Sequence, residues 1–376
     1  MKVLLDATAI PANLGGVGRY VDDLVPELIK EGVNLALAVQ ERDVAHFSAK
    51  VPRAHLFPVP PVLENRAARL AWEQVGLPAL VRRLQPDVLH CPHYTFPSLH
   101  KVPVVVTLHD ATFFSHPQAH GCLKQRFFTT AIRRAVAGAD ALVVPSAATR
   151  DETMKYVGGE ASRFHVAYHG VDQQVFHPVD DAERERVRRA LGLAERSYIG
   201  FLGTLEPRKN VPNLVRAWVQ AFHDDPQAPA LVLAGGKGWD QEVEPALAAV
   251  PKHMTVLRPG YLPLEDLPGF LSGSEVLAYP SIAEGFGLPV LEAMACGAAV
   301  LTTRETSLPE VGGQAVAYCG LDAASISRAL VELHVDAGRR AELRRAAQER
   351  ASSEQFSWRA SARAHVAAYQ EALARG

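Results

Sequence analysis

Cysteine is scarce in this sequence: the 376 residues include four, and no two of them form a CxxC pair. Cys296 and Cys319 lie in apolar runs, where the reduced thiols of a protein core are expected. This spacing argues against a zinc site and a disulfide framework, and it is typical of a reducing compartment. We therefore expect a cytoplasmic protein.

Long hydrophobic runs are also absent. The N-terminal apolar run in MKVLLDATAIPANLGG covers only a few residues before Asp6, which is too short for a signal peptide. No window approaches the roughly 20 apolar residues that cross a bilayer. We expect a soluble protein, with peripheral attachment to the inner face of the plasma membrane as the alternative.

An excess of charge of one sign is missing as well, since 39 Lys and Arg stand against 41 Asp and Glu. A nucleic-acid partner is not expected, because it would need a clustered basic surface. The charge is uneven, however: residues 1–170 carry +3 and the remainder carries −5. These basic side chains form solvated helix faces or, alternatively, a docking site for an anionic membrane surface or a phosphorylated acceptor. Eight of them fall on two predicted helices of the first half: Arg66, Arg69, Arg82, Arg83, Lys124, Arg126, Arg133 and Arg134.

What the sequence does contain is a regular alternation of short apolar runs with longer amphipathic ones, the pattern of parallel α/β sheets. In the first half the strand-like runs are KVLLDA, LALAVQ, DVLHCP, VPVVVTLHD, ALVVPS and FHVAYHG. A second series follows with YIGFLG, ALVLAG, MTVLRPG, VLAYPS, AAVLTT and AVAYCG. Each series is long enough for one doubly wound, Rossmann-like domain, and the chain is too long for a single ordinary core.

The break between the two series falls in YHGVDQQVFHPVDDAERE, where turn residues and a proline precede a charged helix. We predict a first domain at residues 1–170, a linker at 171–180 and a second domain at 181–355. A terminal helix, at about residues 356–376, follows, and no predicted strand comes after it in the alternating pattern. Two such domains are expected to face a central cleft, because ligands of these sheets bind at the carboxyl ends of the strands.

The loop after the first strand, AIPANLGGVGRYVDDL, gathers Gly15, Gly16 and Gly18 just before a helix. Glycine lets the backbone approach a ligand closely, and a helix N-terminus attracts anions. The spacing is GGxG rather than GxGxxG, and the second strand ends without an acid, so a nicotinamide dinucleotide is disfavoured. A flexible turn is the alternative interpretation.

A polar pair, His109 and Asp110, follows the strongly apolar run VPVVVTL. We expect this pair at the cleft, where an imidazole can donate to a sugar hydroxyl or stabilise developing charge. The alternative is a histidine that only makes a hydrogen bond at the strand end. His90 and His93 are weaker candidates, because two histidines three positions apart without acids are not a metal signature.

In FLGTLEPRKN a strand ends at Gly203, and Arg208 and Lys209 stand side by side just before a helix. A lysine offers a point charge and an arginine can bind two oxygens at once, so this loop predicts a diphosphate site. A surface loop with incidental charge is the alternative.

The stretch AEGFGLPVLEAMACG places Glu284 and Glu292 eight positions apart among glycines. Proline favours the first position of a helix and glycine follows its end, so we predict a helix from Pro289 to Cys296 that stops at Gly297. Glu284 then lies in the loop and Glu292 about one turn into the helix. Because carboxylates accept hydrogen bonds from paired hydroxyls, we expect one acid to hold a sugar and the other a ribose, with phosphate between them.

Taken together, these stretches resemble the E-x7-E signature and the accompanying loops of glycosyltransferase family 4, whose members are retaining GT-B glycosyltransferases. The resemblance rests on EGFGLPVLEAMACG, GTLEPRKN, GGVGRY, TLHD and HGVD, and it spans nearly the whole chain. It implies a GT-B fold whose last helix crosses back to the N-terminal domain, with the acceptor bound by the first domain and the nucleotide sugar by the second. No D-x-D triplet occurs, which agrees with an enzyme that needs neither a metal nor another cofactor.

By the same resemblance, Glu284 would contact the donor sugar, Glu292 the ribose, and Arg208 and Lys209 the diphosphate, with His109 near the reacting carbon. The other expected donor contacts are Gly16, Gly203, Thr204, Gly285, Phe286, Gly287 and Leu288. Two positions depart from the family pattern. Thr204 stands where many relatives have an arginine, so Arg208 would have to compensate, and His169 stands where relatives tend to have an asparagine.

The resemblance predicts a retaining hexosyltransferase with a front-face mechanism and no protein nucleophile. We expect mannose from GDP-mannose, with UDP-glucose as the next donor. The expected acceptor is a glycan, a glycolipid or a small molecule of bacterial polysaccharide or glycoconjugate synthesis. We expect a monomer or a homodimer. A nucleotide-sugar epimerase and an inactive GT-B binding scaffold are alternatives, whereas a pyridoxal-phosphate phosphorylase is disfavoured because no lysine is suitably placed.

Overall fold

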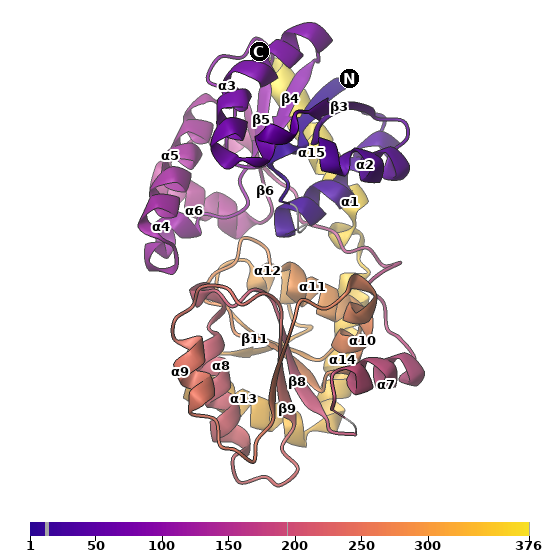
Figure 1. Cartoon of the computed structure of the whole chain (residues 1–376), viewed down its shortest axis with the longest axis vertical. Coiled ribbons are helices and arrows are strands. Elements are labelled where there is room, and N and C mark those ends of the chain that lie inside the picture. Colours follow the sequence, from indigo (N-terminus) through magenta and orange to yellow (C-terminus); the bar gives the residue numbers. More distant parts are fainter. Residues whose placement is uncertain (12–14, 194, 376) are drawn as a thin grey trace. The chain divides into compact units, whose positions relative to one another are not determined.

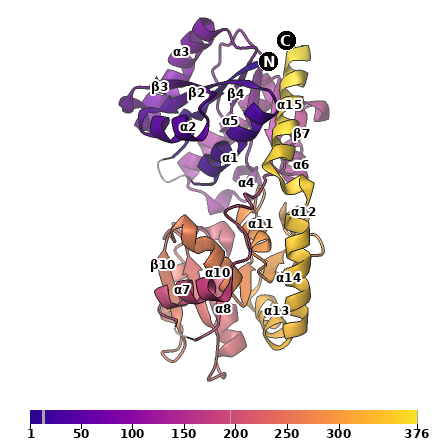
Figure 2. The ribbon, with the colours of Figure 1, turned by 90° about the vertical axis from the view of Figure 1, so that its right-hand side faces the viewer.

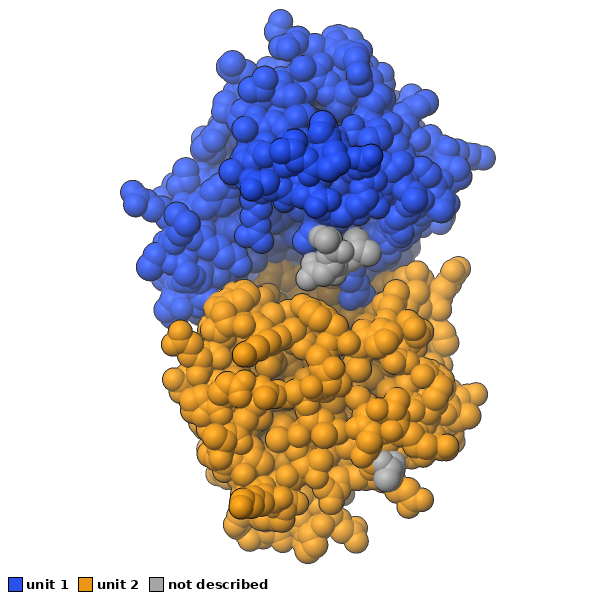
Figure 3. Space-filling model, in the orientation of Figure 1, with its two compact units in different colours: residues 1–170, 354–376 blue, residues 171–353 orange. Residues whose placement is uncertain are grey.

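The chain divides into two compact units (Figure 3). The computed structural model describes residues 1–11, 15–193 and 195–375. Unit 1 comprises residues 1–170 and 354–376, and unit 2 comprises residues 171–353. The segment predicted as a linker, residues 171–180, forms the beginning of unit 2 and ends where helix α7 starts.

In the described part of unit 1, parallel strands form one sheet in the order β3-β2-β1-β4-β5-β6-β7 (Figure 1). The order reverses between β1 and β4, so the loops that follow these two strands lead to opposite sides of the sheet and leave a crevice at its carboxyl edge. The strands are β1 (Lys2–Asp6), β2 (Asn34–Gln40), β3 (His55–Val59), β4 (Val88–Cys91), β5 (Val104–Thr107), β6 (Ala141–Val144) and β7 (Phe164–Val166).

Strand β3 has no counterpart among the predicted strand runs. It lies at one edge of the sheet, where it pairs with β2, and its sequence HLFPV includes Pro58. Proline removes a backbone donor but is tolerated at a sheet edge, and an edge strand needs no continuous apolar run. The other six strands of unit 1 coincide with predicted runs, and all of them except β7, at the opposite edge of the sheet, are almost wholly buried.

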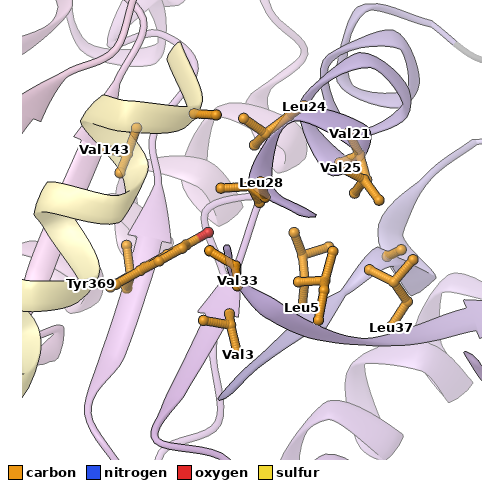
Figure 4. Packing of buried hydrophobic residues seen from close by; sticks show 14 of the residues in the cluster. Val3, Leu5, Val21, Leu24, Val25, Leu28, Val33, Leu37, Val143 and Tyr369 are labelled. Atoms are coloured by element: carbon orange, nitrogen blue, oxygen red, sulfur yellow. The ribbon is translucent and has the colours of Figure 1, made fainter. Parts of the chain in front are cut away.

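Two helical layers cover the sheet of unit 1. Alternate residues of β1 point to opposite faces: Leu4 joins the apolar cluster beneath α3 and α5, whereas Val3 and Leu5 join the cluster beneath α1 and α15 (Figure 4). This alternation follows from the two-residue period of a strand. The helices of unit 1 are α1 (Gly16–Lys30), α2 (Val44–Lys50), α3 (Arg66–Leu84), α4 (Thr112–Ser115), α5 (Cys122–Gly138), α6 (Ala147–Val157) and α15 (Trp358–Arg375).

Helix α15 returns from unit 2 and packs beside α1 and against β6 and β7 (Figure 2). This confirms the predicted crossing of the last helix to the N-terminal domain. The contact is close where the chain leaves unit 1: a Cβ at Gly170 would lie 2.2 Å from the backbone nitrogen of Trp358. A larger residue at Gly170 would therefore push the start of α15 away.

A chain of buried hydrogen bonds joins α15 to the sheet. Nδ1 of His365 lies 2.7 Å from the carbonyl oxygen of Ser361, and it must donate there because a carbonyl only accepts. Burial is the main cause that lowers the pKa of His365, to about 4, so the ring is neutral near pH 7. Its Nε2 is therefore the acceptor for the hydroxyl of Tyr20 in α1, 2.6 Å away.

The direction of the remaining bonds follows from this one. The hydroxyl oxygen of Tyr20 accepts from Thr107 of β5 at 3.0 Å, and Thr107 accepts from Nε2 of His90 in β4 at 2.9 Å. Nδ1 of His90 is then the acceptor for the hydroxyl of Tyr369, also 2.9 Å away. The chain begins and ends in α15, and each donor meets an acceptor when both histidines are neutral. The chain of bonds therefore fixes the position of α15 along its own axis relative to the sheet of unit 1.

In the described part of unit 2, parallel strands form a second sheet in the order β10-β9-β8-β11-β12-β13, which reverses between β8 and β11. Each of these strands coincides with a predicted run: β8 (Tyr198–Leu202), β9 (Ala230–Ala234), β10 (Val256–Gly260), β11 (Val276–Tyr279), β12 (Val300–Thr303) and β13 (Ala317–Cys319). The helices of unit 2 are α7 (Asp181–Ala190), α8 (Val211–Phe222), α9 (Val243–Ala248), α10 (Leu267–Gly273), α11 (Leu288–Ala295), α12 (Leu308–Gly312), α13 (Ala323–Val335) and α14 (Ala337–Ala351).

Tyr20→Phe should destabilise unit 1, because it leaves Nε2 of His365 and the hydroxyl of Thr107 buried without their partner. We expect a loss of about 1–3 kcal/mol in the free energy of unfolding, measured with urea. Tyr156→Phe is the matched control, since Tyr156 is exposed. Equal stability of the two variants would contradict the hydrogen-bond chain.

The same chain predicts a pH dependence of stability. His365 is neutral in the fold, but it titrates near pH 6.5 once the chain is unfolded. The unfolded state therefore binds more protons below pH 6.5, so stability is fully present above that pH and is lost as the pH falls toward 4. We expect the urea midpoint of unit 1 to fall between pH 7 and pH 5, and to fall less in His365→Gln. An identical pH profile of the two proteins would rule out this role.

Candidate functional site

The charged residues predicted for unit 2 lie in two neighbouring loops at the carboxyl edge of its sheet. Strand β8 ends at Leu202, and Arg208 and Lys209 lie in a short 3-10 turn directly before α8. Glu284 lies in the loop between β11 and α11. The backbone N–H of Ile282 donates to the carbonyl oxygen of Arg208 at 2.7 Å, which fastens one loop to the other. Both loops therefore flank the point where the strand order reverses, the usual ligand position in such sheets.

The carboxylate of Glu284 binds both cations of the other loop. Nζ of Lys209 donates to its Oε1 at 2.6 Å, and Nη1 of Arg208 donates to its Oε2. Nε of Arg208 donates in addition to Glu206, at 2.8 Å. Glu284 and Lys209 are buried, and Arg208 is partly buried. The three residues Arg208, Lys209 and Glu284, which we call the Glu284 cluster, carry a net charge of +1.

Neutral groups complete the surroundings of this carboxylate. The hydroxyls of Ser281 and Tyr279 lie 2.5 Å and 3.0 Å from Oε1 of Glu284, and the hydroxyl of Tyr279 also accepts from Lys209. The backbone N–H of Glu284 donates to the hydroxyl of Thr306 at 2.8 Å. These bonds hold the carboxylate in one orientation.

The charges of the cluster shift the pKa values of its members. Burial raises the pKa of Glu284, but Arg208 and Lys209 outweigh it and bring the pKa to about 2. Burial also lowers the pKa of Lys209, and Arg208 adds to this, while Glu284 acts in the opposite direction. The hydroxyl of Tyr279 has a raised pKa, chiefly because it is buried and also because it lies beside Glu284. Glu284 is thus an ionised carboxylate at any pH where the protein would work.

Helix α11 begins beside the cluster. It covers Leu288–Ala295, one residue earlier than predicted, so Pro289 occupies the second helical position rather than the first. The capping residue is Gly287, whose φ of +105° suits glycine and whose Cβ would lie 2.9 Å from Leu308. No side chain caps the helix, Pro289 has no N–H, and the N–H of Val290 donates to the carbonyl oxygen of Gly287 at 3.0 Å. The positive end of the helix dipole still favours an anion here. The predicted stop at Gly297 is confirmed, with a φ of +69°.

The other predicted donor residues of unit 2 lie around these two loops. Glu292 is buried one turn into α11, as predicted. Gly203 and Thr204 follow β8 directly, Phe286 is buried, and the hydroxyl of Ser307 donates to the carbonyl oxygen of Phe286 at 2.9 Å. Gly285 lies between Glu284 and Phe286 in the same loop.

In unit 1 the predicted residue His109 lies just beyond β5, at the carboxyl edge of the sheet. Its Nε2 lies 2.7 Å from the carbonyl oxygen of Pro92 and therefore carries the proton. Burial is the main cause that lowers the pKa of His109, so the ring is neutral and its Nδ1 is an acceptor. We had expected this imidazole to donate to a sugar hydroxyl or to stabilise developing charge. In this tautomer it can only accept such a bond.

Aromatic rings surround His109. The ring of Tyr20 meets it edge-on with the centroids 5.1 Å apart, and those of Tyr94 and His93 lie at 5.7 Å and 5.9 Å. His169, the residue that departs from the family pattern, lies 6.4 Å away. His109 is thus held by Pro92 on one side and by rings on the others.

Of three further candidates in unit 1, two have side chains that make structural hydrogen bonds, and the third is Gly16. Asp110 accepts from the backbone and the hydroxyl of Thr112, at 3.1 Å and 2.7 Å, so it shapes the start of α4. His90 belongs to the hydrogen-bond chain of α15. Gly16 is the first residue of α1, and a Cβ there would meet nothing within 4 Å. Among the described residues of unit 1, no packing contact therefore explains this glycine. Residues 12–14 of the same loop lie outside the described residues.

Sequence reasoning missed several residues that shape these sites. Tyr279 and Ser281 bind Glu284, Glu206 binds Arg208, and Tyr20 contacts His109. Tyr279, Ser281 and Glu206 stand within or beside the stretches VLAYPS and GTLEPRKN, so proximity to a motif was the available signal. Tyr20 ends GGVGRY, but only the fold shows that its ring reaches His109.

Neither a metal site nor a membrane span was found in the part of the chain that the structure describes. No three His, Cys, Asp or Glu side chains there are grouped so that they could bind a metal ion. No helix there is both long and apolar enough to cross a membrane.

Comparison with known proteins matches both halves of the chain to family models. Residues 14–175 match the model "Glycosyltransferase Family 4", and residues 183–350 match "Glycosyl transferases group 1". An Escherichia coli protein named O-antigen chain mannosyltransferase B is 29% identical over 84% of this chain and 85% of its own length. A Mycolicibacterium smegmatis protein named GDP-mannose-dependent alpha-(1-6)-phosphatidylinositol monomannoside mannosyltransferase is 26% identical over 90% and 91%.

A solved structure, that of Anabaena HepE in complex with UDP-glucose, has the same fold. It superimposes with a TM-score of 0.76 and 18% identity, covering 99% of this chain and 98% of that one.

Glu284→Gln should destabilise unit 2, because it leaves two cations in a buried site without their carboxylate. We expect a loss of about 3 kcal/mol in the free energy of unfolding. Sulfate should restore more stability to this variant than to the wild type, since an anion can replace the missing charge. Glu244→Gln, which breaks the exposed pair with Arg258, is the control and should change little. A variant as stable as the wild type would show that the cluster does not hold these loops together.

Proposed function

The chain is a GT-B glycosyltransferase of the family 4 type, and from this premise we propose that it transfers mannose from GDP-mannose to a glycan or glycolipid acceptor with retention of configuration. The single observation that carries the proposal is the Glu284 cluster at the point where the strand order of unit 2 reverses. The names of the relatives support mannose as the sugar and bacterial glycan synthesis as the setting.

In the proposed donor complex, Arg208 and Lys209 bind the diphosphate. Both cations are held beside Glu284, and both come from the loop before α8. A diphosphate offers them more charge than one carboxylate, so it competes for the same donors. Release of Glu284 from its cations then frees an ionised carboxylate for the hydroxyls of the donor sugar. Glu292, one turn into α11, is assigned to the ribose.

The reaction itself requires charge stabilisation more than a nucleophile. As the bond between the anomeric carbon and the diphosphate breaks, negative charge grows on the leaving phosphate oxygen. Arg208, Lys209 and the N-terminus of α11 stabilise that charge in the donor complex. The leaving oxygen accepts the proton of the acceptor hydroxyl as the new bond forms on the same face. His109, with Nδ1 as an acceptor, is assigned a contact with a hydroxyl of the donor sugar. This chemistry needs neither a metal ion nor another cofactor.

A second donor is favoured by one specific observation. The fold matches that of a protein whose structure contains UDP-glucose, although at 18% identity this likeness extends only to the fold. UDP-glucose is therefore the alternative donor. An epimerase would use the same donor half-site but would release free sugar, so it differs in its product.

Thermal shift measurements with GDP, UDP, GDP-mannose and UDP-glucose test the donor assignment. A nucleotide that binds the folded state raises the melting temperature, and we expect the guanosine compounds to raise it most. Lys209→Ala should abolish the shift, while Lys237→Ala, a lysine outside the cluster, should leave it unchanged. A larger rise in melting temperature with the uridine compounds would make UDP-glucose the donor in place of GDP-mannose. If none of the four compounds raised the melting temperature, the proposed donor site would be rejected.

A further inference from the structure

A groove on unit 1 lies between α3 and α5, on the face of the sheet opposite to α15. Its volume is about 580 Å³. The apolar part of its lining consists of Leu70, Tyr94, Phe96, Leu123, Phe127 and Ala131. This volume and lining suit a hydrocarbon chain better than a sugar, because most of the surface that lines the groove is apolar.

The apolar lining continues onto the surface around the groove. Leu123 is 85% exposed and Phe127 is 39% exposed, both on α5. Large apolar side chains that gather at the rim of a groove mark a binding surface rather than ordinary surface residues.

The rim is also cationic. Helix α5 carries Lys124, Arg126, Arg133 and Arg134 and no acidic residue. Arg126 and Arg134 line the groove, and Arg134 donates to the hydroxyl of Ser98 at 2.6 Å. The acid in the lining, Glu73, is buried and accepts from Arg69 at 3.2 Å and from Thr95 at 2.6 Å. Its charge is therefore offset, and the open side of the groove is left positive.

The groove borders the half-site of unit 1. Tyr94 and Thr95 line the groove, and the ring of Tyr94, which is buried, lies 5.7 Å from that of His109. A single side chain therefore separates the groove from His109. The apolar lining and the cationic rim match two parts of an anionic amphiphile: its chain and its phosphate.

We propose that this groove binds the hydrocarbon chain of a phosphate-bearing amphiphile, with the phosphate at Arg126 and Arg134, and that this amphiphile is the acceptor. Binding in the groove does not depend on the proposed function. Only the identification of the amphiphile as the acceptor rests on it. The proposal selects a single amphiphile molecule over attachment to a membrane surface, because the apolar residues line an open groove between α3 and α5 that also contains Arg126 and Arg134.

Calorimetric titration with decyl phosphate below its critical micelle concentration tests the groove. Decyl phosphate should bind, while inorganic phosphate and neutral decyl glucoside should bind much more weakly. Arg126→Gln should weaken binding about tenfold, the effect of one charge-assisted hydrogen bond. Phe127→Ser should weaken decyl phosphate and decyl glucoside alike. Arg133→Gln is the matched control: Arg133 lies on the same helix but over the ring of Phe114 rather than in the groove, so binding should not change.

Three outcomes would overturn the proposal. The first is equal binding by Arg126→Gln and the wild type, and the second is an equal loss in Arg133→Gln, which would indicate a general basic surface. The third is binding to phosphatidylglycerol vesicles without any binding of monomeric decyl phosphate, which would make this face a membrane-docking surface. Nucleotide thermal shifts are recorded on the same variants. If the wild type shows normal nucleotide shifts but no binding of decyl phosphate, the groove alone is rejected. If it binds decyl phosphate but shows no nucleotide shift, the donor site alone is rejected.

Discussion

The ion pairs of Glu284 with Arg208 and Lys209 are the interaction on which the donor half-site depends. They join the loop after β8 to the loop after β11, two segments that are about 75 residues apart in the sequence but adjacent in the sheet. A buried carboxylate bound to two cations is costly to break unless another anion takes its place. This makes the cluster a pre-formed site whose cations are already positioned for phosphate. It also explains why a loop suited to an anion contains an acid: the carboxylate holds the cations in place.

In unit 1 the constraint is different: helix α15, which returns from unit 2, must keep a fixed position along its own axis. Apolar packing between α1 and α15 favours contact but does not define the position along the axis. The hydrogen-bond chain through Tyr20, Thr107 and His90 defines it, because each donor in the chain has one acceptor and the bonds run in one direction. Tyr20 also contacts His109. The C-terminal helix therefore supports the candidate site of unit 1 without contributing a residue to it.

Much of the fold could be predicted from the sequence because buried parallel strands are continuous apolar runs. The edge strand β3 could not, since its short run HLFPV stands among prolines, which is the pattern of a loop: Pro52, Pro58, Pro60 and Pro61. Sequence motifs also identified Arg208, Lys209 and Glu284 as site residues, yet their mutual pairing depends on which strands are neighbours. The tautomer of His109 could not be read from the sequence for a similar reason. The carbonyl oxygen of Pro92, which fixes the tautomer, is 17 residues away in the sequence.

The central claim is that a diphosphate replaces Glu284 as the partner of Arg208 and Lys209. A crystal structure of the protein with GDP or UDP bound tests it most directly. The account predicts that both cations lie within hydrogen-bond distance of phosphate oxygens and that at least one of them has left the carboxylate of Glu284. A nucleotide bound at another place, with both ion pairs of Glu284 intact, would contradict it.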